Sequence, residues 1–208
     1  GDSLVNVSAE ERKKALVDYA LPKNIKKMQA DMEKYKIFYD KWFFESELHK
    51  SGAVKAVVDL LTEKGLTYEK DGAVWYKNKE VLTQKLLKEG KSQKYIDNLE
   101  LKDDVLIRQN GNPTYFTADI AYHKNKFDRG FTTLIDVWGA DHHGHVMRMK
   151  GAMDAIGYDG DKLNVVLMQL VKLVKDGELV RMSKRTGKAI QLGDLLDEVP
   201  VDSARFLF

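Results

Sequence analysis

Residues 132–168, TTLIDVWGADHHGHVMRMKGAMDAIGYDGDKLNVVLM, decide the fold class of this chain. The stretch opens on a β-branched run, residues 132–138, whose lack of polar alternation is typical of a buried parallel strand. A helix is expected next, with an apolar face made by Val146, Met149, Met153 and Ile156 and with Gly157 past its end. A second strand begins near residue 162. Strand, helix and strand within about 40 residues predict a βαβ unit, and such sheets bind ligands at the carboxyl ends of their strands.

Three histidines, His142, His143 and His145, directly follow the first of these strands. They have three interpretations: a metal site, a structural turn, and a substrate or nucleotide site. Zinc ligands usually converge from separate segments, whereas the side chains of adjacent His142 and His143 point in different directions. Gly139, just before them, lets a ligand approach the backbone closely. The pattern favours a substrate or nucleotide site, and the other two interpretations stay open.

The composition is that of a globular protein with a sizeable core. The chain has 208 residues, 43% of them hydrophobic and 32% charged, which suits one large domain or two small ones. Lys and Arg number 34 against 32 Asp and Glu, so the formal net charge of +2 neither indicates nor excludes a nucleic-acid partner. Cysteine is absent, which excludes disulfides and thiolate zinc sites. The sequence shows no run of 18 apolar residues and no signal-peptide pattern, so we expect a soluble, cytoplasmic protein.

Local signals predict helices at the start of the chain. A capping box made by Ser8 and Glu11 begins a helix that we expect to end at Pro22. A second helix is expected from Asn24, and a compact amphipathic helix is expected over residues 53–65.

The middle of the chain predicts a hairpin, an insertion and a further strand. Residues 66–76 form the hairpin, with its turn at residues 71–72. Residues 77–104 are rich in lysine and glutamate, and we interpret them as a mostly helical insertion, so that the expected fold carries an inserted α+β segment. A strand from Val105, a turn at residues 110–113 and a helix follow.

A basic loop follows the βαβ unit. The second strand of that unit is expected to run to residue 174 and to turn at residues 176–177. The loop beyond it includes RMSKRTG, residues 181–187, and its charges suit a phosphate. On charge alone, a solvated basic loop fits equally well.

Four motifs in this chain resemble those of class I aminoacyl-tRNA synthetases. The MSK of the basic loop, after a hairpin and downstream of a βαβ unit, is similar to the second signature of that class. The order seen in arginyl-tRNA synthetases is the order found here: YDKWFFES (39–46), TYFTADIAYH (114–123), GADHHGH (139–145) and RMSKRTG (181–187). The match covers most of the chain except roughly residues 77–104.

The resemblance implies the second part of a Rossmann-like α/β catalytic domain. Residues 1–208 would be a partial domain, because the first class signature, HIGH, is not in this sequence and is expected upstream. A helical anticodon-binding domain is expected downstream, and the chain alone is expected to be inactive. The implied activity is ATP-dependent activation of L-arginine to arginyl-adenylate and its transfer to tRNA(Arg). Magnesium would accompany ATP, and the protein is expected to be a monomer without a membrane partner or a metal of its own.

The resemblance also assigns arginine-binding residues. Tyr115 and Asp119 match the arginine-binding tyrosine and aspartate of the family, and they stand four residues apart, on one side of a helical turn. Glu45 matches a family acid that approaches the substrate. A guanidinium is well met by carboxylates with an aromatic ring over its face. By their chemistry alone, Tyr115 could equally be a core residue and the two acids ordinary surface groups.

The ATP contacts come from the same resemblance. The expected ATP-binding residues are Gly139, Asp141, Met182, Ser183 and Lys184. Lys184 is expected to stabilise charge on the phosphates, and His142 to face the substrate. His143 and His145 are expected to be structural or to support the site from behind. Arg181 and Arg185 depart from the usual lysine and serine of the class signature, and they are candidate phosphate contacts.

Two rival interpretations remain. Another class I synthetase or a related nucleotidyl transferase would share the fold and the phosphate loop, but it would not need Glu45, Tyr115 and Asp119 around a cation. A non-catalytic RNA-binding paralogue would keep the fold without the chemistry. Thermal shifts across a panel of amino acids would separate the first rival from an arginine enzyme.

Overall fold

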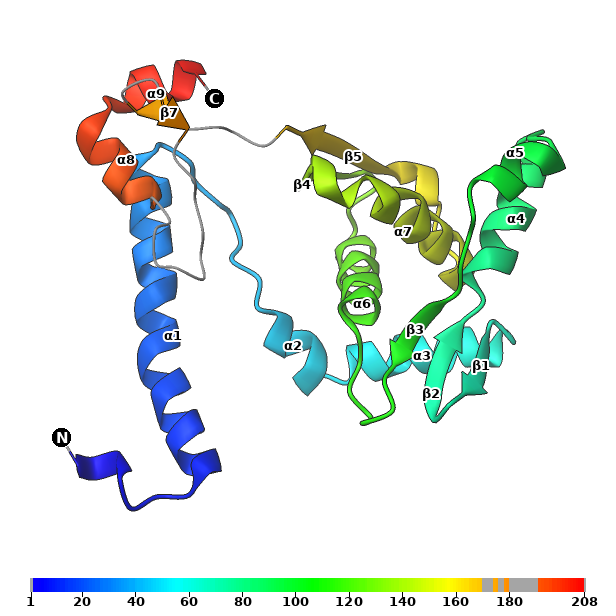
Figure 1. The fold of residues 1–208 in the computed structure, drawn as a ribbon, viewed down its shortest axis with the longest axis horizontal. Helices are drawn as coiled ribbons and strands as arrows, with labels where there is room; N and C mark the ends of the chain where they lie inside the picture. The colour runs from blue at the N-terminus through cyan, green and yellow to red at the C-terminus, as the bar shows by residue number, and fades with distance from the viewer. Residues whose placement is uncertain (1, 170–173, 176–177, 180–190, 208) are drawn as a thin grey trace. The chain divides into compact units, whose positions relative to one another are not determined.

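The computed structural model describes residues 2–169, 174–175, 178–179 and 191–207. These residues fall into two compact units, one made of residues 1–42 with 171–208 and the other of residues 43–170 (Figure 1). Each unit has its own packing, and the predicted ligand-binding residues that the structure describes lie in the second.

The first unit is built on one long helix. Helix α1 (Ala9–Lys34) starts at the predicted capping box, with Ser8 and Glu11 bonded to each other's backbone. Near its other end α1 is in contact with α8 (Leu192–Glu198), and Lys34 pairs with Asp197 at 2.5 Å. The unit also contains a short 3-10 helix, the helix α9 and an antiparallel pair of strands, with bounds Asp2–Leu4, Val201–Leu207, Val174–Lys175 (β6) and Glu178–Leu179 (β7). The pairing of β6 with β7 confirms the predicted reversal of the chain there.

The predicted helix end at Pro22 is wrong, because α1 continues through it to Lys34. A proline removes one helical hydrogen bond and crowds the preceding turn, at a cost of about 3 kcal/mol. Pro22 and the turn before it are exposed, so water can satisfy the carbonyl that loses its partner. The apolar residues after Pro22 also keep the helical spacing, and the helix is therefore not interrupted.

The second unit begins with helices and a small sheet. Helices α2 (Glu45–Lys50) and α3 (Ala53–Glu63) precede the hairpin β1 (Thr67–Lys70) and β2 (Ala73–Tyr76). Asp71 and Gly72 form the turn of this hairpin, both with positive φ, as the sequence predicted. Strand β3 (Asp104–Ile107) adds antiparallel to β2, so the sheet order is β1-β2-β3.

Residues 77–104 are mostly helical, as predicted, and they pack on the rest of the unit. They form α4 (Asn78–Lys88) and α5 (Gln93–Asn98). Helix α4 lies against α7 (His143–Ile156), and the approach is close because Gly151 of α7 faces Leu82 of α4. Whether this segment is an insertion stays a prediction.

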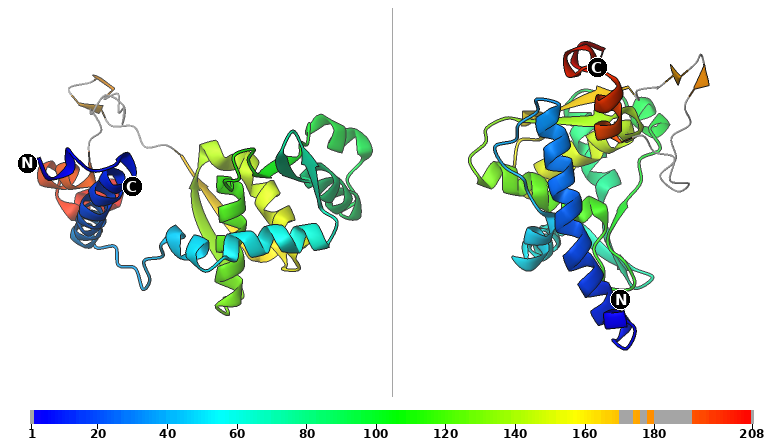
Figure 2. Two further views of the ribbon diagram at one scale, coloured as in Figure 1. Left: turned by 90° about the horizontal axis from the view of Figure 1, so that it is seen from below. Right: turned by 90° about the vertical axis from the view of Figure 1, so that its left-hand side faces the viewer.

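The predicted βαβ unit is present (Figure 2). Strand β4 (Leu134–Gly139) leads through the 3-10 turn η2 (Ala140–His142) into α7, and the turn η3 (Gly160–Lys162) leads into β5 (Leu163–Met168). Strands β4 and β5 pair in parallel from Leu134 with Leu163 to Gly139 with Met168. The core below them joins residues of α3, α6 (Tyr115–Asp128), α7 and these strands.

Two expectations for the parallel strands are corrected. β5 ends at Met168 rather than running on to residue 174, because β4 ends at Gly139 and offers no ladder partner beyond it. The run 132–138 is also covered on only one face of the sheet within the described residues. Leu134 and Asp136 are buried, whereas Ile135 and Val137 are 68% and 67% exposed.

Candidate active site

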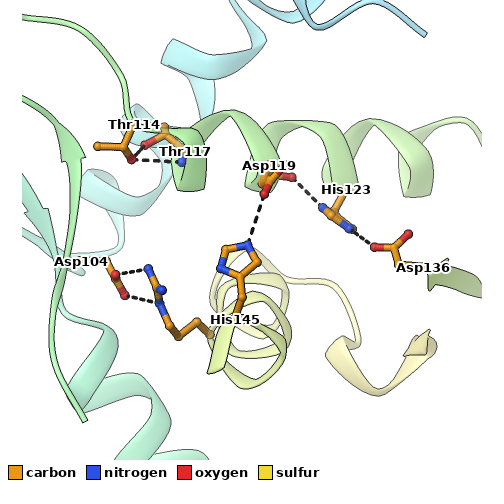
Figure 3. A network of polar contacts seen from close by, with 8 residues as sticks. Asp104, Thr114, Thr117, Asp119, His123, Asp136 and His145 are labelled. Atoms are coloured by element: carbon orange, nitrogen blue, oxygen red, sulfur yellow. Dashed lines mark hydrogen bonds and ion pairs between the residues drawn. The ribbon is translucent and has the colours of Figure 1, made fainter. Parts of the chain in front are cut away.

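Helix α6 carries the predicted arginine-binding residues, and its first turn is tied to β3. Thr114 caps the helix, accepting a hydrogen bond from the Thr117 amide at 3.4 Å and donating to the Val105 carbonyl at 2.7 Å. The Thr117 hydroxyl donates to the Leu106 carbonyl at 2.7 Å (Figure 3 shows both threonines). These bonds fix where α6 starts, and therefore where its second turn lies.

The two predicted α6 residues face outward. Phe116 and Ile120 are buried in the core, which leaves Tyr115 and Asp119 on the opposite face of the helix. Tyr115 is 80% exposed and the Asp119 side chain is 47% exposed. The alternative of a core tyrosine is therefore wrong for Tyr115, and both side chains are accessible to a ligand.

The carboxyl ends of β4 and β5 form the open edge predicted from the sequence. Gly139, the last residue of β4, pairs with Met168 of β5. A Cβ atom at Gly139 would lie 2.5 Å from the Asp141 carboxylate oxygen Oδ1, so the close approach of that carboxylate requires glycine. Asp141 and His142 are both largely exposed. This is the edge where parallel α/β sheets bind ligands.

The three histidines point in different directions. The His142 ring lies beside Trp138, with 6.2 Å between ring centroids, and its Nε2 is 3.9 Å from Asp141 Oδ2. His143 instead lines a cavity together with residues of α4 and of the segment 99–104. His145 turns toward α6, where its Nε2 lies 3.2 Å from Asp119 Oδ2 (Figure 3).

His145 is thus the histidine in contact with a predicted arginine-binding carboxylate. Its ring is mostly buried and packs on Trp138 and Phe116, with centroid distances of 5.2 and 5.6 Å. The sequence predicted a supporting role for His145 but did not identify its partner. Three histidines within four residues carry no signal that says which of them contacts Asp119, which lies 26 residues before His145 in the chain.

Glu45 lies at the start of α2, which packs against α6. Its carboxylate is exposed and contacts His49 Nε2 at 3.3 Å, four residues along the same helix. Among the contacts of the described residues, none joins Glu45 to Tyr115 or Asp119. The meeting of the two acids around one ligand stays a prediction.

A buried polar cluster behind Asp119 was not predicted. His123, on α6, contacts the Asp119 backbone carbonyl and the Asp136 carboxylate of β4 (Figure 3). Lys126 Nζ donates to the same carboxylate at 2.7 Å. Burial by itself raises the pKa of Asp136, but the hydrogen bonds from His123 and Lys126 outweigh it and hold the pKa below its ordinary value. The only sequence signal was a lone acid within the apolar run 132–138.

Two further predictions for this site concern metal binding and the basic loop. Within the described residues, no group of three or more His, Asp or Glu side chains is arranged to hold a metal ion. The predicted residues Arg181, Met182, Ser183, Lys184 and Arg185 lie outside the described residues. In the described part of the chain, no helix combines the length and the apolar character that a membrane crossing requires.

A comparison with known protein families identifies the family of this chain. Residues 6–207 match the family model described as tRNA synthetases class I (R), catalytic domain. The chain belongs to this family. The predicted resemblance and the Rossmann-like α/β fold class are both confirmed.

Two relatives align with this synthetase domain over its whole length. It is 56% identical to an arginine–tRNA ligase of Caldanaerobacter subterraneus and 50% identical to one of Acetivibrio thermocellus. Both alignments cover 100% of this chain but 34% of the relative, so the chain spans about a third of the length of these proteins.

Two solved structures share the fold. A Campylobacter jejuni protein assigned as an arginyl-tRNA synthetase superposes with a TM-score of 0.75 at 35% identity, covering 95% of this chain and 39% of its own. Arginyl-tRNA synthetase of Thermus thermophilus superposes with a TM-score of 0.66 at 19% identity, covering 91% of this chain and 35% of its own. The second likeness concerns the fold alone.

Proposed function

We propose that this chain is part of the catalytic domain of an arginine–tRNA ligase, and we call the protein of the relatives' length that contains it the full-length protein. The observation that carries the proposal is an exposed carboxylate, Asp119, one helical turn from the exposed Tyr115 on α6 and in contact with His145, which follows the end of the parallel strand β4. Family membership supports the same activity. The proposed substrates are L-arginine, ATP with Mg²⁺, and tRNA(Arg).

The protein would recognise arginine by the positive charge of its guanidinium group. The Asp119 carboxylate would accept hydrogen bonds from the guanidinium, and Tyr115 would pack beside its flat face. Glu45 is proposed to supply a second carboxylate, and His142 to face the substrate. Because Asp119 already accepts from His145, one of its oxygens is oriented before arginine arrives.

ATP would bind at the end of β4. Gly139 has no side chain, which leaves room at the strand end for the Asp141 carboxylate, and this carboxylate is proposed to reach the ribose. Met182, Ser183 and Lys184 are proposed to complete the ATP site, with Arg181 and Arg185 as candidate phosphate contacts. Magnesium would enter with ATP rather than as a metal held by the protein.

The chemistry needs no nucleophilic side chain. The arginine carboxylate oxygen attacks the α-phosphorus of ATP, pyrophosphate leaves, and arginyl-adenylate forms. A ribose hydroxyl at the 3′ end of tRNA(Arg) then attacks the acyl carbon, and AMP leaves. Catalysis would consist of positioning and electrostatic stabilisation, with Lys184 stabilising the charge that develops on the phosphates. We further propose a cytoplasmic, monomeric enzyme.

The proposal is tested by measuring ATP–pyrophosphate exchange in the full-length protein with each of the twenty amino acids, in the presence of tRNA. We expect exchange with arginine only, followed by charging of tRNA(Arg). Exchange that prefers another amino acid would favour a different class I synthetase. Absence of exchange with all twenty would favour the non-catalytic paralogue.

A further inference from the structure

His123 is a buried titratable residue that the proposed chemistry does not use. It is 2% exposed, and both of its ring nitrogens contact oxygen atoms. Nδ1 lies 2.7 Å from the backbone carbonyl of Asp119, and Nε2 lies 2.5 Å from the carboxylate of Asp136. A carbonyl can only accept, and so can an ionised carboxylate. The ring of His123 is therefore held between two acceptor groups, one on α6 and one on β4.

These contacts join the two elements that carry the candidate site. Asp119 lies on α6, whereas Asp136 lies on β4, three residues before Gly139. Beyond Gly139 the chain turns and presents His145 to the carboxylate of Asp119. The main chain of Asp119 is therefore held by His123 and its carboxylate by His145, and both supports lead back to β4 (Figure 3).

Stability alone does not explain a buried pair of this kind. Replacing a buried ion pair by apolar residues of similar volume is often neutral or stabilising, because the desolvation penalty offsets the attraction. Apolar partners are at hand here, since the His123 ring packs against the rings of Tyr122 and Trp138, with centroid distances of 6.0 and 6.3 Å. A hydrogen-bonded pair differs from an apolar one in fixing a single relative position of α6 and β4.

We propose that His123 is a positioning residue for arginine recognition, which acts by holding Asp119 of α6 in register with β4. This inference rests on the proposed function. It assigns His123 no contact with arginine or ATP. His123 would act only through the position of Asp119. Its loss should therefore weaken the recognition of arginine and leave the binding of ATP nearly unchanged.

The test uses two variants of the full-length protein that break the contact from opposite sides. His123→Phe keeps an aromatic ring of similar shape without donors, and Asp136→Asn keeps the shape of the acceptor but removes its charge. Small misplacements of recognition groups can cost up to about 100-fold, so we expect kcat/KM for arginine to fall roughly 10- to 100-fold in both variants, with KM for ATP nearly unchanged. Val57→Ala is the control, because Val57 is fully buried in α3 and has no place in the proposed site. It should lower the thermal midpoint without this selective loss.

A double-mutant cycle separates positioning from general stability. If His123 acts through Asp119, His123→Phe should cost little in an Asp119→Asn background, because the group that it positions is already removed. Equal losses in both backgrounds would overturn the inference, and so would a kcat/KM for arginine that is unchanged in the single variants. Losses for arginine and ATP that match those of Val57→Ala would also overturn it. If the wild-type protein shows no arginine-dependent exchange, it is the proposed function that fails.

Discussion

Replacing Asp119 by asparagine in the full-length protein should selectively weaken arginine recognition. The Asp119 side chain is 47% exposed and its carboxylate accepts from His145 at 3.2 Å, so an oxygen remains available to a guanidinium. Asparagine keeps the shape and removes the charge. It also places an amide donor where the guanidinium would need an acceptor.

The size of the effect follows from the kind of bond that is lost. A hydrogen bond to a charged group contributes about 1.5–3 kcal/mol net. A factor of ten corresponds to about 1.4 kcal/mol, so kcat/KM for arginine should fall roughly 10- to 150-fold. Citrulline has nearly the shape of arginine without its charge, and its kcat/KM should change much less. The preference for arginine over citrulline should therefore narrow by a similar factor.

The assay is ATP–pyrophosphate exchange with arginine and with citrulline, together with KM for ATP. Asp128→Asn is the matched control, because Asp128 is an acid at the far end of α6 that pairs with Lys124 at 2.7 Å. The control should leave the arginine preference unchanged. A preference that Asp119→Asn also leaves unchanged would show that Asp119 does not read the guanidinium.

Three further changes have expected outcomes. Lys184→Ala should slow adenylate formation about 10²- to 10³-fold with arginine affinity nearly unchanged, as measured by single-turnover kinetics, and an unaltered rate would contradict the phosphate role. Gly139→Ala should raise KM for ATP more than KM for arginine. The new Cβ would lie only 2.5 Å from the Asp141 oxygen Oδ1, so the Asp141 carboxylate would have to move. Equal changes in the two KM values would count against an ATP site at this strand end. The lowered pKa of Asp136 means that its contribution to folding is complete above the ordinary aspartate pKa of about 3.9 and is lost as the pH falls below it. Urea unfolding at pH 7, 4 and 3 should therefore show a smaller acid loss in Asp136→Asn than in wild type, and parallel losses would refute the assignment.

Local signals were sufficient for most of the elements. The capping box at Ser8, the turn at Asp71 and Gly72, and the glycine past the end of α7 each act within a few residues, and the structure shows all three. The βαβ unit was predictable for the same reason, since its apolar periodicity changes from strand to helix and back within one stretch. Pro22 shows the limit of such signals, because an exposed helix can accommodate a proline when water meets the freed carbonyl.

The sequence by itself identified the family and named Tyr115 and Asp119 as candidate site residues on one side of a helical turn, because motif order and helical spacing are properties of the chain alone. Their exposure is a finding of the structure. Tertiary structure decided which side chains support them. Asp119 meets His145, 26 positions away, and its backbone meets His123, which in turn meets Asp136 on β4. The sequence assigned none of these three contacts, and the two that leave α6 depend on how α6 packs beside β4 and α7. That packing is set by the burial of apolar side chains on the opposite face of α6, and only the folded chain brings the polar groups into register.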